Sequence, residues 1–213
     1  MRICHTTEAI KQIMEISNNV PKVELILASG SPRRKEMLQN LGVNFSVYVT
    51  DTDESRKEGE LAEDFVARLA RDKARAAQQK IGRSDPIAIL AADTIVVQNG
   101  RVYGKPTDFE HAKRIWQSLS GNKHQVMTAI SLLHGSTMSV KVSVTEVEFA
   151  RITETQMQRY WQTDEPKDKA GAYAIQGLAC AWVKSIKGSY SNVVGLPLRE
   201  VNLLLSEIEL NWL

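Results

Sequence analysis

The sequence predicts a mixed α/β fold, in which a twisted sheet is flanked by helices, and three observations support this prediction. Short apolar runs typical of strands alternate with amphipathic segments typical of helices. Asn99-Gly100 separates two further apolar runs and favours a hairpin. The length of 213 residues, with 43% hydrophobic and 24% charged residues, suits one large domain or at most two small ones.

The core is expected to begin with a strand at 23–28, because this run is short and largely apolar. A helix should follow, with Ser31 as its N-cap and Pro32 in its first position. Gly42 is a typical residue for the end of this helix. The next strand is expected at 45–49.

The middle of the chain predicts one long helix and one buried strand. Apolar residues recur at helical spacing over 61–80. The run 87–92 is short and almost continuously apolar, as expected for an internal parallel strand. The hairpin at Asn99-Gly100 should then join two short strands.

The second half predicts two capped helices. Thr107 and Glu110 have capping-box spacing and indicate a helix to about 119, and Thr153 and Gln156 repeat this spacing for a helix to about 162. The remaining elements are expected as antiparallel strands at 126–133 and 139–149, a last strand near 183 and a last helix at 197–208.

The beginning of the chain and its charge limit the class of protein. We expect residues 1–22 to form an arm with a short amphipathic helix, and residues 23–213 to form a single domain. A net charge of +2 argues against stable nucleic-acid binding. The sequence has no leader pattern and no apolar stretch near the roughly 20 residues that a membrane span needs. We therefore expect a cytoplasmic protein without a membrane partner.

The turn after the first strand carries two arginines. Gly30, Ser31 and Pro32 lead into Arg33 and Arg34 in the first turn of the expected helix. Backbone N–H groups at a helix start favour anions, and guanidinium groups match phosphate oxygens. An ordinary N-cap with solvated arginines would leave the same pattern, but its place after a buried strand favours a phosphate site.

Lys73 lies on the apolar side of the expected 61–80 helix. With about 100° per residue, it falls between the directions of Leu69 and Val66, while three arginines of this helix lie on the opposite side. A lysine on a buried stripe either extends to solvent or meets a partner. The second alternative places Lys73 in a cleft, where it holds an anion.

Asp93 follows a run of small and aliphatic residues. A carboxylate there is costly unless it is paired or binds a metal, and ligands of open α/β sheets bind at strand ends. The alternative is a buried aspartate that accepts backbone hydrogen bonds. Asp53 and Glu54 follow another expected strand and could supply oxygen ligands to a divalent cation, although a solvated acidic loop would have the same composition.

Two further residues carry weaker signals. Lys105 lies in a Gly-Lys-Pro turn soon after Asp93, where it is either a pocket cation or an ordinary turn residue. Gln176 precedes Gly177, and its amide offers one donor and one acceptor that suit a base edge. A hydrogen bond within its loop is the alternative.

Seven segments follow one another in a recognisable order. They are ASGSPRR at 28–34, the lysine of LARDKA at 69–74, AADTIV at 91–96, GKP at 104–106, LSGNKHQVMTA at 119–129, DKAGAYAIQG at 168–177 and NVVGLPL at 192–198. Together they resemble the Maf family of nucleoside triphosphate pyrophosphatases. The DKAGAYAIQG form is similar to the branch that hydrolyses dTTP and UTP.

The resemblance implies a fold with two lobes around a cleft, a divalent cation (Mg²⁺ or Mn²⁺), and a cytoplasmic, often homodimeric, enzyme acting on a nucleoside triphosphate. Matched by motif, the site residues are Asp93 as proton acceptor; Arg33, Thr94 and Gln176 for base preference; and Ser29, Arg34, Glu54, Lys73 and Lys105 as polar residues of the phosphate pocket. Glu54 and Asp93 are the candidate ligands for the metal. Residues 1–22 fall outside the family pattern.

Two other functions fit the same residues. The expected dTTP and UTP activity could extend to modified pyrimidine nucleotides, whereas the first alternative is a broader house-cleaning pyrophosphatase for modified nucleotides in general. The other is a nucleotide-binding regulator of cell division that needs no turnover. An intact Asp93 among a full set of cations favours an enzyme.

Overall fold

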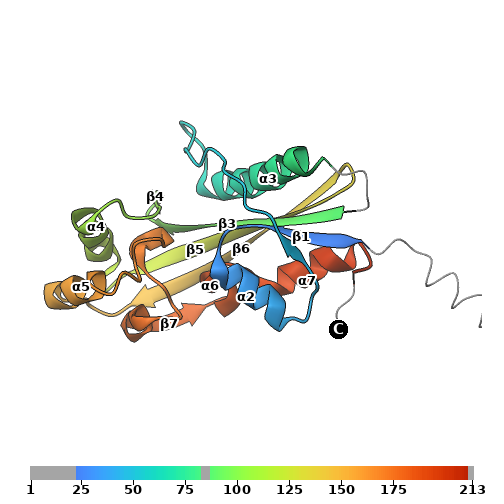
Figure 1. Ribbon diagram of the computed structural model, residues 1–213. Helices are drawn as coiled ribbons and strands as arrows, with labels where there is room; N and C mark the ends of the chain where they lie inside the picture. Colours follow the sequence, from blue (N-terminus) through green and yellow to red (C-terminus); the bar gives the residue numbers. More distant parts are fainter. Residues whose placement is uncertain (1–22, 83–86, 211–213) are drawn as a thin grey trace, which may run out of the picture.

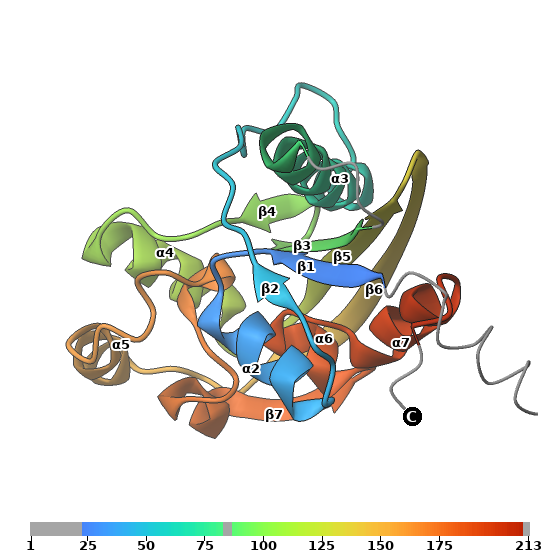
Figure 2. The same ribbon diagram turned by 45° about the vertical axis from the view of Figure 1, so that its right-hand side comes forward.

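The computed structural model describes residues 23–82 and 87–210. Its centre is a seven-stranded sheet with the order β2-β1-β3-β5-β6-β7, in which β4 pairs with β3. The sheet contains both parallel and antiparallel pairs and is flanked by helices, which confirms the predicted mixed α/β fold (Figures 1 and 2). The arm and helix expected at 1–22 lie outside the described residues.

The elements follow one another along the chain as Figure 1 labels them. The strands are β1 (Glu24–Ala28), β2 (Ser46–Val47), β3 (Ile87–Gln98), β4 (Arg101–Tyr103), β5 (Lys123–His134), β6 (Thr137–Phe149) and β7 (Val183–Lys187). The helices are α2 (Pro32–Asn40), α3 (Ala62–Ile81), α4 (Phe109–Leu119), α5 (Glu154–Trp161), α6 (Tyr190–Val194) and α7 (Leu198–Ser206), with two 3-10 turns, η1 (Ala170–Ala172) and η2 (Leu178–Trp182).

Helices cover both faces of the sheet. Helix α3 lies on one face, and α2, α6 and α7 lie on the other (Figure 1). Alternate residues of β3 therefore enter different cores: Leu90 packs with α2 and α7, whereas Ile95 packs with α3. Within the described part of the chain, no helix is long and apolar enough to cross a membrane.

Strand β3 differs from the prediction in a way that matters for function. The expected strand at 87–92 and the first strand of the hairpin are one continuous strand, so Asp93 lies within a strand and not at its end. On one edge, β1 pairs with β3 as far as Ala91, and β4 pairs with it only from Val96. Residues 92–95 therefore have no strand neighbour on that edge, while β5 pairs along the other.

The hairpin turn and the shortest elements can be compared with the sequence predictions. Asn99 and Gly100 have φ angles of 49° and 77°, the left-handed values that a tight hairpin turn requires, which confirms the predicted hairpin. Only Ser46 and Val47 of the strand expected at 45–49 pair with β1. The five-residue helix α6 was not predicted, because so short a segment carries no helical periodicity.

One of the two predicted capping boxes is wrong. Helix α4 begins one residue later than expected, since the Asp108 carboxylate, and not Thr107, accepts the hydrogen bond from the His111 N–H at 2.7 Å. Aspartate at this position also favours the helix dipole. Helix α5 has the predicted capping box between Thr153 and Gln156.

An aromatic cluster supports the segment after α5. The Trp116 indole donates a hydrogen bond of 2.8 Å to the Ala172 carbonyl. Next to it, Gly171 has a φ of +68°, and a Cβ there would lie 2.7 Å from Val96 of β3. Glycine therefore lets this segment pass directly over β3, where it forms one wall of the pocket.

Candidate active site

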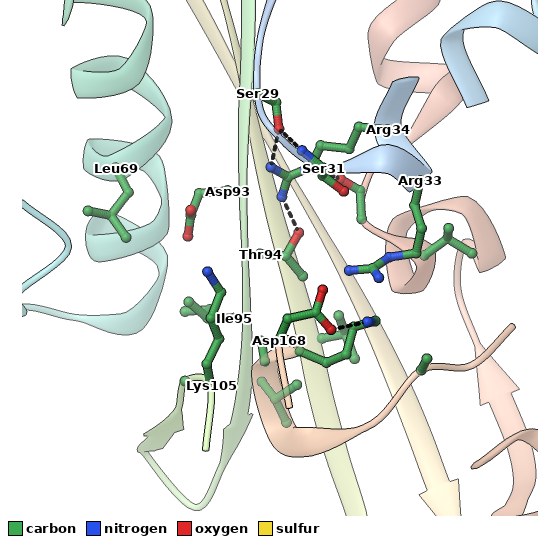
Figure 3. Close-up of a pocket in the computed structure, with 18 of the residues that line it drawn as sticks. Ser29, Ser31, Arg33, Arg34, Leu69, Asp93, Thr94, Ile95, Lys105 and Asp168 are labelled. Carbon is green, nitrogen blue, oxygen red and sulfur yellow. Dashed lines mark hydrogen bonds and ion pairs between the residues drawn. The ribbon is translucent and has the colours of Figure 1, made fainter. Parts of the chain in front are cut away.

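A pocket of about 450 Å³ lies where β3 lacks a strand neighbour. Figure 3 shows side chains from both sides of β3 pointing into this space. Its lining comes from the turn between β1 and α2, from α3 and β3, from the turn after β4, from residues 168–176 and from the end of α6. The pocket thus lies at the carboxyl end of β1, as the phosphate-site prediction requires.

Two consecutive residues of β3 serve the two sides of the pocket. Asp93 and Thr94 point to opposite faces of the sheet, because side chains alternate along a strand. Asp93 meets Lys73 of α3 at 2.5 Å, whereas Thr94 meets Arg34 of α2 at 3.0 Å. A single peptide unit of β3 therefore carries one polar side chain for each side of the pocket.

The α3 side of the pocket is an ion-pair cluster. Lys73 Nζ lies 2.5 Å from Asp93 Oδ1 and 2.7 Å from Glu54 Oε1. Lys73 therefore points into the pocket, as the helical wheel predicts, and its anionic partners in the structure are two carboxylates of this chain. Burial opposes ionisation of Glu54, but its hydrogen bond to Lys73 and the positive charges nearby hold its pKa below the ordinary value.

Lys73→Met is expected to lower turnover roughly 10- to 100-fold, because a hydrogen bond between charged groups is worth about 1.5–3 kcal/mol. Without the ammonium, the pKa of Glu54 should rise, because the hydrogen bond and charge that lower it are removed. Activity of the variant should therefore fall at a higher pH than that of the wild-type protein as the solution is acidified. A pH profile of the activity checks both effects, and identical profiles for the two proteins would show that Lys73 only fills space.

A second ion pair holds the loop that carries Glu54. Arg68 of α3 binds both carboxylate oxygens of Glu60, at 2.7 and 2.9 Å, and also the Ser55 carbonyl at 2.9 Å. The hydrogen bond from Arg68 lowers the pKa of Glu60 to about 2. The Arg68–Glu60 ion pair is therefore complete above the ordinary pKa of a glutamate and is lost only as pH falls through about 2.

Arg34 forms the α2 side of the pocket, but its N–H groups donate to acceptors within this chain. Its guanidinium group donates to Ser29 Oγ at 3.1 Å, to the Ala92 carbonyl at 2.8 Å, to Thr94 Oγ1 at 3.0 Å and to the Gly195 carbonyl at 2.8 Å. Burial lowers the pKa of Arg34, although Asp93 opposes this. Arg34 thus occupies the gap in the sheet and satisfies a β3 carbonyl that a strand would otherwise bind.

Thr94 is also engaged inside the protein. Thr128 Oγ1 donates to the Asn192 carbonyl at 3.0 Å, so its contact of 3.0 Å with Thr94 Oγ1 requires Thr94 to be the donor. Thr94 meanwhile accepts from Arg34. Its one hydroxyl proton is therefore used within this chain, and Thr94 positions its neighbours more than it can donate to a ligand.

Three other predicted residues keep unused donors. Ser29 accepts from Arg34 and from the Ser31 N–H, and its own hydroxyl proton has no acceptor in the described part of the chain. Arg33 and Lys105 line the pocket without a hydrogen bond or ion pair to any described residue. Lys105 extends toward Asp93 (Figure 3). These groups can bind an anionic ligand.

The candidate metal ligands divide into two groups. Glu54 and Asp93 both line the pocket. Asp53 does not, because its carboxylate accepts two hydrogen bonds of 2.9 Å from Ser55 in the exposed loop. In residues 23–82 and 87–210, no group of three or more metal-binding side chains comes together. Any cation here would therefore draw on two carboxylates of the chain and on oxygens of its ligand.

Gln176 and Asp168 lie on the opposite wall. Gln176 is exposed at the rim, and its amide makes no hydrogen bond to another described residue. Asp168 was missed by the sequence argument, although it begins the quoted DKAGAYAIQG segment. It forms an ion pair with Lys169 and points toward Thr94 and Arg33 (Figure 3). Despite burial, Lys169 and then Arg33 keep the pKa of Asp168 low.

The apolar part of the lining was also missed. Phe65 and Leu69 precede Lys73 at four-residue spacing on α3, so one helical stripe supplies both the apolar wall and the ammonium. Tyr173 closes the other side, and its hydroxyl contacts the buried His124 at 2.9 Å. The helical wheel already placed Phe65 and Leu69 on the same side of the helix as Lys73. A stripe of apolar residues, however, usually indicates core packing alone.

Comparisons with known proteins agree with the sequence motifs. A family model described as Maf-like protein matches residues 24–208. A protein of Hahella chejuensis named dTTP/UTP pyrophosphatase is 47% identical over 189 residues, covering 89% of this chain and 94% of that protein. A protein of Escherichia coli K12 with the same name is 50% identical over 182 residues, covering 85% and 91%.

Solved structures show a more distant similarity. The structure of a HAM1 protein from Coxiella burnetii covers 87% of this chain and 99% of its own, with a TM-score of 0.47 and 16% sequence identity. The Ham1 protein of Staphylococcus aureus has the same TM-score at 14% identity.

Proposed function

The chain belongs to the family of Maf-like proteins, and on this premise we propose that it hydrolyses dTTP and UTP to the monophosphate and pyrophosphate. The observation that carries this proposal is a carboxylate, Asp93, that is 8% exposed and lies in a pocket with free cationic side chains. Relatives with about half of their residues identical to this chain bear that activity as their name.

The reaction needs a base and a set of cations. A water oxygen attacks the α-phosphorus, the bond from this phosphorus to the bridging oxygen breaks, and pyrophosphate leaves. Asp93 takes the proton of the water, and Lys73 holds this carboxylate in place at 2.5 Å. Arg33 and Lys105 neutralise the charge that develops on the phosphate oxygens and on the leaving pyrophosphate.

A divalent cation, Mg²⁺ or Mn²⁺, fits the donor set. Glu54 and Asp93 present their oxygens to one shared positive group, Lys73, so both carboxylates already face the same point. Magnesium in nucleotide sites is usually bound by one or two carboxylates together with substrate phosphates. Such a cation would supply Lewis-acid charge at the phosphates, and Glu54 and Asp93 would hold it.

Pyrophosphate release from dTTP is expected to require a divalent cation. Assays with dTTP, UTP, CTP and purine triphosphates, each with Mg²⁺ and with a chelator, test both parts of the proposal. We expect release from dTTP and UTP that disappears with the chelator and returns with added Mg²⁺ or Mn²⁺. Equal release from all nucleotides would favour the broader house-cleaning enzyme, and no release from any would contradict the activity.

Gln176→Ala is expected to reduce base selectivity more than the best rate. An amide can pair with O4 and N3–H of thymine or uracil, whereas cytosine presents an amino group and a bare N3. If the bound base covers Gln176, an unpaired group there costs about 1–3 kcal/mol, so the ratio of kcat/KM for UTP over CTP should fall by roughly 5- to 150-fold at most. If all rates fall together and this ratio stays constant, Gln176 does not recognise the base.

The location and assembly of the protein stay predictions. The cytoplasm and a homodimer are implied by the family resemblance. Sedimentation of the purified protein, with and without nucleotide, tests the assembly.

A further inference from the structure

We propose that Tyr160 and Glu165 are positioning residues that fix the pocket segment 174–178 and thereby set nucleotide affinity, although neither residue lines the pocket. The proposal rests on the proposed function for its kinetic consequences only. Its structural basis is a short chain of hydrogen bonds that connects α5 to the pocket wall.

The two residues hold both ends of the segment. The Ala174 N–H donates to the Tyr160 hydroxyl at 3.1 Å, and this hydroxyl donates to Glu165 Oε1 at 2.6 Å. The Leu178 N–H donates to Glu165 Oε2 at 3.1 Å. One carboxylate therefore binds the end of the segment directly and its beginning through a phenol, and Gln176 lies between these two points.

The fit between Glu165 and the segment is tight. A Cβ at Gly177 would lie 2.2 Å from three atoms of the Glu165 carboxylate group. Gly177 has a φ of −106°, which any residue can adopt, so its backbone does not demand glycine. A side chain at 177 would instead have to displace the Glu165 carboxylate, because this group rests directly on the backbone of the segment.

Tyr160 and Glu165, the anchor of this segment, are themselves held in place. Tyr160 is 3% exposed and packs against Trp116 and Trp182, with ring centroids 5.5 and 4.8 Å away. Burial and the hydrogen bond to Glu165 raise the pKa of Tyr160, so its hydroxyl keeps the proton that it donates. Thr163 connects Glu165 back to α5, since its hydroxyl accepts from the Glu165 N–H at 3.4 Å and donates to the Tyr160 carbonyl at 2.7 Å.

The anchored segment forms part of the pocket wall. Ala174, Ile175 and Gln176 all line the pocket. A turn closed by the Gly177 N–H and the Ala174 carbonyl at 3.2 Å keeps the segment compact. When an anchor is removed, this wall should sample other positions, and substrate binding must then first restore the right one.

Tyr160→Phe and Glu165→Gln are expected to raise KM for dTTP roughly 5- to 30-fold, as expected for one lost hydrogen bond of a buried or charged group. The first variant removes the acceptor of the Ala174 N–H. The second leaves one acceptor oxygen for two donors. Because Asp93 is untouched, kcat should stay within about threefold. Tyr190→Phe, at an exposed tyrosine of α6 outside the pocket lining, is the matched control and should change neither constant.

Gly177→Ala provides an independent test of the same contact. The added Cβ should displace the carboxylate and raise KM as Glu165→Gln does. In a Glu165→Ala background, which has no carboxylate to displace, Gly177→Ala should change KM by less than about twofold. Equal effects of Gly177→Ala in the two backgrounds would overturn the proposal.

Amide hydrogen exchange without nucleotide separates this proposal from the activity. Exchange at Ala174 should become faster in Tyr160→Phe and exchange at Leu178 faster in Glu165→Gln, whereas the amides of β5 should keep their protection. Unchanged exchange at these two amides, or unchanged KM in an active enzyme, would overturn the positioning role. If the wild-type protein releases no pyrophosphate, the proposed function fails, and exchange alone decides on the anchor.

Discussion

Asp93→Asn is expected to lower turnover about 10²- to 10⁴-fold, the usual loss when a general base is removed. Asparagine has the same shape but cannot take a proton from water. The Lys73 ammonium keeps Glu54 as a partner at 2.7 Å, so the variant should fold normally. Steady-state pyrophosphate release from dTTP measures the loss, and circular dichroism with a thermal melt measures the fold.

The neighbouring acidic loop offers a matched control for this variant. Asp53→Asn makes the same chemical change in a carboxylate that is hydrogen-bonded to Ser55 and lies outside the pocket. Its turnover should stay close to that of the wild-type protein. Near-native turnover in Asp93→Asn, or an equal loss in Asp53→Asn, would contradict the assignment of the base.

Arg34→Met is expected to lower the free energy of unfolding by about 2–6 kcal/mol. The variant leaves the buried carbonyls of Ala92 and Gly195 without donors, and each buried acceptor without a partner costs about 1–3 kcal/mol. Thr94 and Ser29 lose the same donor, so activity of the folded fraction should fall as well. Urea unfolding measures the stability change.

Two further variants show whether the four hydrogen bonds of Arg34 or its charge alone stabilise the protein. Arg34→Lys keeps the charge but cannot reach four acceptors, so it should restore little of the lost stability. Arg33→Met alters the preceding residue, which makes no hydrogen bond or ion pair to another described residue, and should change stability by less than about 0.5 kcal/mol. Full rescue by lysine would show that a point charge is sufficient.

The fold and part of the site could be predicted because their signals are local. Apolar runs and turn residues located most of the strands and helices. The direction of Lys73 followed from helical periodicity alone, and the structure confirms it. Cap residues are less certain, since Thr107 and Asp108 are both good caps and only the backbone geometry selects the aspartate.

The rest depends on contacts between distant parts of the chain. The sequence shows Arg34 in the first turn of a helix, where solvent or phosphate would be its usual partner. Its observed partners include Ala92 and Gly195, which are 58 and 161 residues away. Asp93 was expected at a strand end, because a polar pair interrupts the apolar run. Only the sheet order reveals that β3 continues past it and lacks a neighbour there.

The alternation of side chains at Asp93 and Thr94 limits which positions can be redesigned. Adjacent residues share one peptide plane, so a substitution that shifts the backbone at 94 also tilts the carboxylate at 93. Engineering a new substrate preference on β3 should therefore lower the hydrolytic rate. The 174–178 segment is attached to α5 instead, away from this peptide. Substitutions in this segment should therefore alter substrate preference while the Asp93 carboxylate keeps its position.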